Sequence, residues 1–142
     1  QRSVEYLIVG GYAVGFHGFP RYTGDIDFFV SVSGDNAEKL IRVLDDFGFG
    51  GIGIKKEDFL KPFFVIEIGR EPRKIQILTG IDGVTFEECR QTAVQSEYLG
   101  RTLKFIGLDA LLRNKKASGR PKDLIDVQEL TGLQGKQGDS SV

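Results

Sequence analysis

The chain carries its most informative run near the N-terminus: Tyr6-Leu-Ile-Val-Gly-Gly-Tyr-Ala-Val-Gly-Phe-His-Gly-Phe-Pro-Arg-Tyr-Thr-Gly-Asp-Ile-Asp-Phe-Phe-Val30. The β-branched and aromatic residues over 4–9 predict a strand, which Gly10 and Gly11 stop. Residues 12–17 predict a short helix, and residues 25–32 a second strand. The run therefore predicts a strand, a glycine turn, a helix and a strand in succession.

Two carboxylates, Asp25 and Asp27, lie two positions apart in the second predicted strand. Side chains two apart in a strand point to one face, roughly 6 to 7 Å apart at the Cβ atoms. Oxygen ligands of this kind favour Mg²⁺ or Mn²⁺. Glycines after a strand, here Gly10 and Gly11, let a phosphate approach the backbone and the start of the next helix. Each signal is common in unrelated proteins, but together they indicate a site for a phosphate and a metal ion.

The rest of the chain predicts an α/β (α+β) architecture, a mixed β-sheet flanked by helices. A helical pattern starts at Asp35 and stops at Gly48, and Thr85 and Glu88 have the spacing of a capping box ahead of a helix that runs to about Val94. The other expected elements are strands over 63–68 and 74–79, a hairpin over 97–106, and helices over 108–117 and 122–130. We interpret residues 1–130 as a single domain and residues 131–142 as a disordered tail.

Length and composition exclude several classes of protein. The 142 residues contain 19 Lys and Arg against 20 Asp and Glu, so a globally basic nucleic-acid coat is excluded. The single cysteine, Cys89, cannot form an internal disulfide and excludes a cysteine-rich zinc site. No apolar run approaches the roughly 20 residues that span a bilayer, so we expect a cytoplasmic domain. Methionine is absent even at position 1, so we expect further sequence upstream.

The run from Tyr6 to Val30 closely resembles the signature of small bacterial nucleotidyltransferase-like proteins of the DNA polymerase β superfamily. These proteins are related to the nucleotidyltransferase toxins of abortive-infection systems. Residues 74–88 and 108–126 are similar to the later blocks of the same family, so the resemblance extends over nearly everything from Tyr6 to Leu130. It implies the nucleotidyltransferase fold.

The resemblance implies an enzyme that uses Mg²⁺ (or Mn²⁺) to move a nucleoside monophosphate from a nucleoside triphosphate to a hydroxyl. The acceptor hydroxyl would belong to an RNA such as tRNA, a protein or a small molecule, and an antitoxin is an implied partner. Asp25 and Asp27 would be the catalytic, metal-holding residues. The nucleotide-binding residues that the resemblance implies are Gly10, Gly11, Arg21, Thr23, Lys116, Arg120 and Lys122, with Asp123 orienting one of these cations.

One position departs from the family, which usually has a third metal-binding carboxylate where this chain has Gln76. A first alternative is a catalytically impaired relative that binds nucleotide or a partner protein without turnover. A second is replacement of the missing carboxylate by a neighbour. In a tight hairpin, facing residues sum to 143, which pairs Glu67 with Gln76 on one face. Glu67 is then the expected third metal ligand.

The C-terminal block is rich in cations: Arg113, Lys115, Lys116, Arg120 and Lys122. Such a cluster is ordinarily a solvated helix face, but local positive charge also complements a polyanion when the net charge is near zero. The only histidine, His17, is expected to have a packing or capping role rather than a catalytic one. Cys89 is expected to be a small buried apolar residue.

Overall fold

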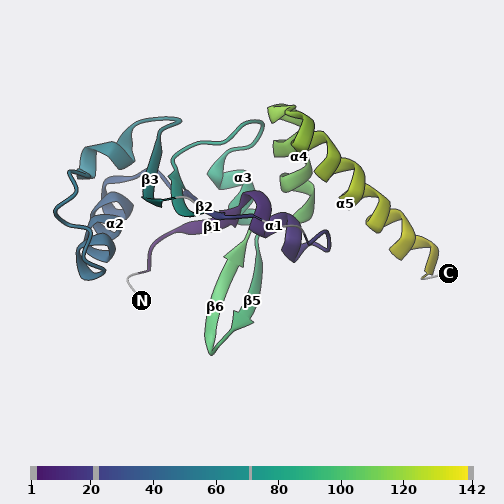
Figure 1. Ribbon diagram of the computed structural model, residues 1–142, viewed down its shortest axis with the longest axis horizontal. Helices are drawn as coiled ribbons and strands as arrows, with labels where there is room; N and C mark the ends of the chain where they lie inside the picture. Colours follow the sequence, from purple (N-terminus) through teal and green to yellow (C-terminus); the bar gives the residue numbers. More distant parts are fainter. Residues whose placement is uncertain (1–2, 21–22, 71, 141–142) are drawn as a thin grey trace.

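The computed structural model describes residues 3–20, 23–70 and 72–140. The strands in this part of the chain form one six-stranded sheet with the order β3-β4-β2-β1-β6-β5. Their bounds are β1 (Tyr6–Val9), β2 (Asp25–Val30), β3 (Val65–Arg70), β4 (Arg73–Leu78), β5 (Val94–Tyr98) and β6 (Arg101–Phe105). The helices are α1 (Gly10–Phe16), α2 (Gly34–Asp46), η1 (Lys56–Leu60), α3 (Phe86–Gln91), α4 (Leu108–Ser118) and α5 (Pro121–Ser140). The expected mixed sheet flanked by helices is confirmed (Figure 1).

The sheet mixes parallel and antiparallel pairs. Strand β1 is antiparallel to β2 and parallel to β6, and β2 is parallel to β4. The hairpins β3–β4 and β5–β6 are antiparallel. The two central strands therefore both come from the N-terminal run, and their ends bring Val9 opposite Asp27.

Two hydrophobic clusters hold the helices to the sheet. The first packs Ala13 of α1 and Leu111 of α4 against β1. The second packs Leu40 of α2 and Phe59 of η1 against the β3–β4 side of the sheet. Burial of each leucine or phenylalanine side chain in these clusters contributes about 1.5 to 3 kcal/mol to stability. In Figure 1, α2 and α4 accordingly lie toward opposite ends of the sheet, and each packs in a different hydrophobic cluster.

Local sequence signals set most of the helix ends. Thr85 and Glu88 form the predicted capping box, in which each side chain accepts from the other residue's backbone N–H. The side chain of Ser33 caps α2 by accepting from the backbone N–H of Asn36. Buried Asn36 in turn donates to the carbonyls of Glu5 and Ser31, which ties the start of α2 to the strands.

Two expected helix ends are corrected. The helix expected to run to about Val94 ends at Gln91, and the helix expected to end at Leu130 continues to Ser140. The backbone of residues 131–140 is thus helical, where a disordered tail was expected. The physical reason is that Leu133, half-buried, continues the apolar face of α5 against the first cluster, near Gly18. None of the helices in the described ranges is long and apolar enough to cross a membrane.

Candidate functional site

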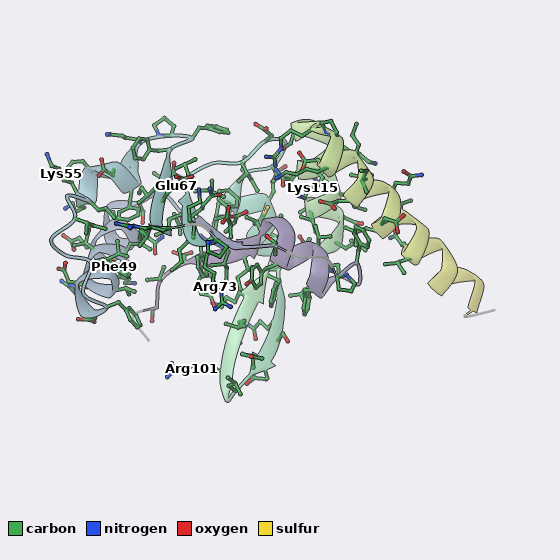
Figure 2. All side chains as sticks on the ribbon, viewed as in Figure 1. Phe49, Lys55, Glu67, Arg73, Arg101 and Lys115 are labelled. Carbon is green, nitrogen blue, oxygen red and sulfur yellow. The ribbon has the colours of Figure 1, made fainter. Side chains whose placement is uncertain are left out.

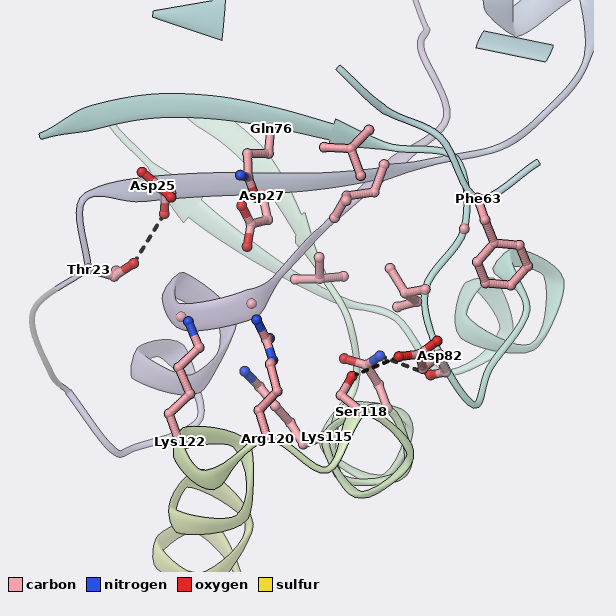
Figure 3. Close-up of a pocket in the computed structure, with 18 residues that line it drawn as sticks. Thr23, Asp25, Asp27, Phe63, Gln76, Asp82, Lys115, Ser118, Arg120 and Lys122 are labelled. Atoms are coloured by element: carbon pink, nitrogen blue, oxygen red, sulfur yellow. Dashed lines mark hydrogen bonds between the residues drawn. The ribbon is translucent and has the colours of Figure 1, made fainter. Parts of the chain in front are cut away.

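A pocket of about 560 Å³ opens where the N-terminal run meets the start of α5. Its walls come from the β1–α1 junction, β2, β4, the segments around Phe63 and Asp82, α4 and α5 (Figure 3). The residues that line it are Val9, Gly10, Gly11, Thr23, Asp25, Asp27, Phe63, Val65, Gln76, Leu78, Gly80, Ile81, Asp82, Asn114, Lys115, Ser118, Arg120 and Lys122. Pockets that bind small ligands commonly have volumes of about 300 to 1,000 Å³.

The acidic wall of the pocket consists of Asp25 and Asp27, which share one face of β2 as predicted. One carboxylate oxygen of Asp27, Oδ1, is buried and has no hydrogen-bond partner among the described residues. Burial raises the pKa of Asp27, and the nearby charge of Asp25 raises it further, while Lys115, Lys122 and Arg120 act in the opposite direction. A buried carboxylate oxygen without a partner is costly, so this position is suited to a cation.

The Asp27 carboxylate is therefore expected to reduce the stability of the fold. Since its folded-state pKa is raised, the cost is absent at acid pH and develops as the pH rises through that pKa. We expect Asp27→Asn to raise the free energy of unfolding by about 1 kcal/mol at pH 7, because the group is partly exposed and screened. The gain should shrink toward pH 4. Urea unfolding of both proteins at the two pH values checks this.

The matched control is Asp109→Asn, at an exposed acid in the first turn of α4, which should not raise stability and should lower it by at most about 1 kcal/mol, because a carboxylate there interacts favourably with the helix N-terminus. A lower stability of Asp27→Asn at pH 7 would contradict the assignment, because it would mean that the ionised carboxylate is well satisfied in the fold.

Two glycines, Gly10 and Gly11, line the pocket next to Asp27 and Thr23. Gly10 has a φ of +68°, and a Cβ added there would collide with the carboxylate of Asp27. A Cβ on Gly11 would lie 2.9 Å from the Cβ and Oγ1 of Thr23. The Thr23 hydroxyl donates to the backbone carbonyl of Asp25 at 3.3 Å. Gly10 thus approaches Asp27, and Gly11 approaches Thr23, because both positions lack side chains. The two glycines begin α1, where a turn before a helix over 12–17 was expected.

The opposite wall is cationic. Lys115 is 4% exposed, and its Nζ lies 3.1 Å from Asp123 Oδ1 and 3.2 Å from Asp126 Oδ2. Arg120 Nε donates to Asp123 Oδ2 at 2.7 Å. Burial disfavours the charge of Asp123, but hydrogen bonds from Arg120 and Lys115 outweigh it and hold the pKa of this carboxyl below its ordinary value. In Figure 3 the nitrogens of Arg120 and Lys122 point toward β2.

The structure places Lys115, rather than Lys116, in this pocket. Lys116 is exposed and does not line it, so the structure does not bring Lys116 into the pocket with Arg120 and Lys122. The reason is helical phase: Asn114, Lys115 and Ser118 share the face of α4 that lines the pocket, whereas Lys116 lies outside that face and is exposed. The expected orientation of a cation by Asp123 is confirmed for Arg120 and holds for Lys115 as well.

The predicted hairpin register is confirmed, since Glu67 pairs with Gln76 and Ile66 with Ile77. Gln76 also pairs with Asp27 on its other side, so these three side chains form a row across β3, β4 and β2. Gln76 Nε2 donates to Glu67 Oε2 at 2.8 Å, and Lys74 Nζ lies 3.7 Å from the same oxygen. Glu67 itself does not line the pocket. The amide of Gln76 therefore lies between Glu67 and Asp27 in the row.

The two pocket carboxylates, Asp25 and Asp27, are chemically suited to bind a metal ion. The buried Oδ1 of Asp27 and the neighbouring Asp25 carboxylate are hard oxygen donors of the kind that bind Mg²⁺. Within residues 3–20, 23–70 and 72–140, however, no group of three or more acidic, histidine or cysteine side chains could hold a metal ion. Asp25 and Asp27 fit a divalent cation as a pair, and Glu67 does not complete a third position.

Two other residues from the sequence analysis, His17 and Cys89, do not line the pocket. The Nε2 atom of His17 makes a hydrogen bond with the carbonyl of Ile106 at 2.8 Å, in agreement with a structural role. Cys89 is fully buried, and burial raises the pKa of its thiol to about 11. Arg21 lies outside the described residues.

Besides Lys115, sequence reasoning missed four lining residues with polar or aromatic side chains. Asn114 donates to the backbone carbonyl of Asp82 at 2.9 Å, and Ser118 donates to the Asp82 carboxylate at 3.3 Å. Phe63 is the aromatic member of the set. No sequence signal placed Asp82 beside α4 or Phe63 beside Gly80, because both contacts depend on the loops around β3 and β4. Figure 2 labels Glu67, on β3, and Lys115, on α4, which belong to different parts of the fold.

No protein-family model matches the chain, and no curated protein matches it significantly.

Proposed function

We propose that this chain binds a nucleoside triphosphate with a divalent cation and transfers the nucleoside monophosphate to a hydroxyl of an RNA, protein or small-molecule acceptor. The observation that carries the proposal is one pocket in which Asp25 and Asp27 face Lys115, Arg120 and Lys122. A triphosphate accompanied by Mg²⁺ needs acidic groups for the metal and cationic groups for the phosphates. The resemblance of the N-terminal run to nucleotidyltransferases supports the same assignment.

The residues divide the proposed work between them. Asp25 and Asp27 would hold Mg²⁺, which would neutralise phosphate charge. Arg120 and Lys122 would contact the phosphates, with Arg120 held in place by its hydrogen bonds to Asp123. In the transfer the acceptor hydroxyl loses its proton to solvent and its oxygen bonds to the α-phosphorus, while the bond from that phosphorus to the pyrophosphate leaving group breaks.

A second candidate function is binding of nucleotide, or of a partner protein, without turnover. Gln76 favours it, because a neutral amide stands beside Asp27 where the family usually has a third carboxylate. An amide is a weaker ligand for Mg²⁺ than a carboxylate and cannot act as a general base. An antitoxin as partner belongs to this second candidate as well as to the first.

Transfer assays with each labelled triphosphate test both candidates. The protein is incubated with Mg²⁺ or Mn²⁺ and with total RNA and protein as acceptors. We expect wild-type labelling that Asp25→Asn abolishes and that Gln76→Asp increases at least about tenfold, since one ligand or base contributes that much in such sites. The exposed acid Asp109 again provides the control, and Asp109→Asn should label as the wild type does.

The outcomes separate the candidates. Triphosphate binding without transfer, measured by calorimetry, supports the second candidate and contradicts the first. Transfer that appears only in Gln76→Asp identifies the missing carboxylate as the cause. Absence of binding by every triphosphate, with either metal ion, overturns both candidates.

A further inference from the structure

Phe63 is an exposed aromatic residue at the edge of the pocket. Its side chain lines the pocket although the residue is 69% exposed. Its backbone has a φ of +48°, in the left-handed region that bulky residues rarely adopt. Strained backbone of this kind persists only where the surroundings enforce it, and it concentrates at ligand sites.

A buried threonine enforces this conformation. The Thr79 hydroxyl donates to the carbonyl of Lys61 at 2.6 Å and accepts from the backbone N–H of Phe64 at 2.7 Å. The Thr79 N–H donates to the carbonyl of Phe64 at 3.0 Å. These bonds attach the turn on both sides of Phe63 to the residue that follows β4. Phe64 then packs toward the second hydrophobic cluster, while the ring of Phe63 is turned outward.

The ring of Phe63 packs against Gly80. A Cβ on Gly80 would lie 2.9 Å from the Phe63 ring, so the ring rests directly on the backbone of this glycine. The rest of the ring remains exposed. Phe63 is thereby held as a flat apolar surface at the pocket rather than packed into the core.

We propose that Phe63 is the platform on which the nucleobase of the bound nucleotide stacks. This inference rests on the proposed function and adds the base-binding subsite to it. Figure 3 shows Phe63 at the opposite end of the view from Thr23 and Asp25, with Asp27 and Gln76 between them. A nucleotide whose phosphates lie between Asp27 and Arg120 has its base free to reach this end. Aromatic side chains stack any base, because every base has a π-face.

The chain contains no tryptophan, so Phe63→Trp introduces a single fluorescent reporter at the platform. We expect its fluorescence to be quenched when ATP with Mg²⁺ is added and to stay unchanged with tripolyphosphate and Mg²⁺, which lacks a base. The control is Phe47→Trp, at an aromatic residue that is 74% exposed and does not line the pocket. Its fluorescence should respond to neither ligand.

Calorimetry of Phe63→Ala supplies the second measurement. Loss of one stacked base should weaken ATP binding about 5- to 100-fold and leave tripolyphosphate binding within about twofold of wild type. Phe63→Tyr, which keeps the ring, should bind ATP as the wild type does. Equal loss of ATP and tripolyphosphate affinity, or an ATP affinity unchanged by Phe63→Ala, overturns the platform while the proposed function stands. Failure of the wild type to bind any nucleoside triphosphate, with either metal ion, overturns both.

Discussion

Replacement of Gly10 with alanine is expected to lower transfer activity about 100-fold, because the new methyl group must displace the carboxylate of Asp27. All three close contacts of a Cβ at this position are made by Asp27. The backbone adds a second cost, since a φ of +68° is unfavourable for alanine by about 1 to 2 kcal/mol. The measurements are the transfer assay and the free energy of unfolding in urea.

The same helix offers a matched control in Gly15. A Cβ at Gly15 would meet only the Pro20 Cα, at 4.0 Å, an ordinary contact. Gly15→Ala should therefore raise the free energy of unfolding by about 0.5 to 1 kcal/mol, as glycine-to-alanine changes within helices do. If both variants behave alike, the close approach of Gly10 to Asp27 does not govern the site.

Replacement of Asp123 with alanine is expected to lower the free energy of unfolding by about 3 kcal/mol. Asp123 is fully buried and binds both Lys115 and Arg120 across the α4–α5 junction. Removal of one partner from a buried ion pair costs about 3 to 5 kcal/mol, because it leaves a buried charge uncompensated. Lys115 keeps its contact with Asp126, which places the loss at the lower end of that range.

The stabilisation by Asp123 is expected to depend on pH in a defined direction. Hydrogen bonds from Arg120 and Lys115 overcome the effect of burial and hold the pKa of Asp123 below its ordinary value. The stabilisation is therefore complete above the ordinary aspartate pKa, about 4, and is lost as the pH falls through the lower folded pKa. The difference between wild type and Asp123→Ala should be constant from pH 5 to 7 and should shrink in stronger acid.

The control for this change is Glu129→Ala, at an exposed acid on the same helix, which should alter stability by less than about 0.5 kcal/mol. Asp123→Ala should also weaken binding of triphosphate, because Arg120 loses the carboxylate that orients it toward the pocket. An Asp123→Ala protein as stable as wild type would show that the buried charges at the junction do not contribute to the fold.

Stability and site are therefore coupled in opposite ways at the two walls of the pocket. On the acidic wall, the partnerless oxygen of Asp27 costs stability and suits a cation. On the cationic wall, Asp123 stabilises the fold and holds Arg120 in position. A ligand with a metal ion and phosphates would give the Asp27 oxygen a partner on the acidic wall and would give Arg120 an anion to bind on the cationic wall. The proposed function requires both contacts.

Short-range patterns were sufficient for much of the fold. Alternation of side chains placed Asp25 and Asp27 on one face, the spacing of Thr85 and Glu88 predicted the start of α3, and turn length fixed the register of Glu67 against Gln76. Each of these signals acts within one element or one hairpin. The backbone geometry of that element alone therefore determines the outcome.

What the sequence determined by itself was the first strand, which ends before Gly10, and the strand that carries Asp25 and Asp27 on one face, because local chain geometry dictates both. Strand pairing placed the two strands at the centre of the sheet, and Gly10 and Gly11 begin α1 where a turn was expected. Only the tertiary structure decided that Lys115 rather than Lys116 enters the pocket, since that depends on which face of α4 the first cluster buries. It also decided that Gln76 stands beside Asp27 and that Phe63 is held outward by Thr79. These contacts join segments far apart in the chain, and packing between elements, not sequence spacing, sets them.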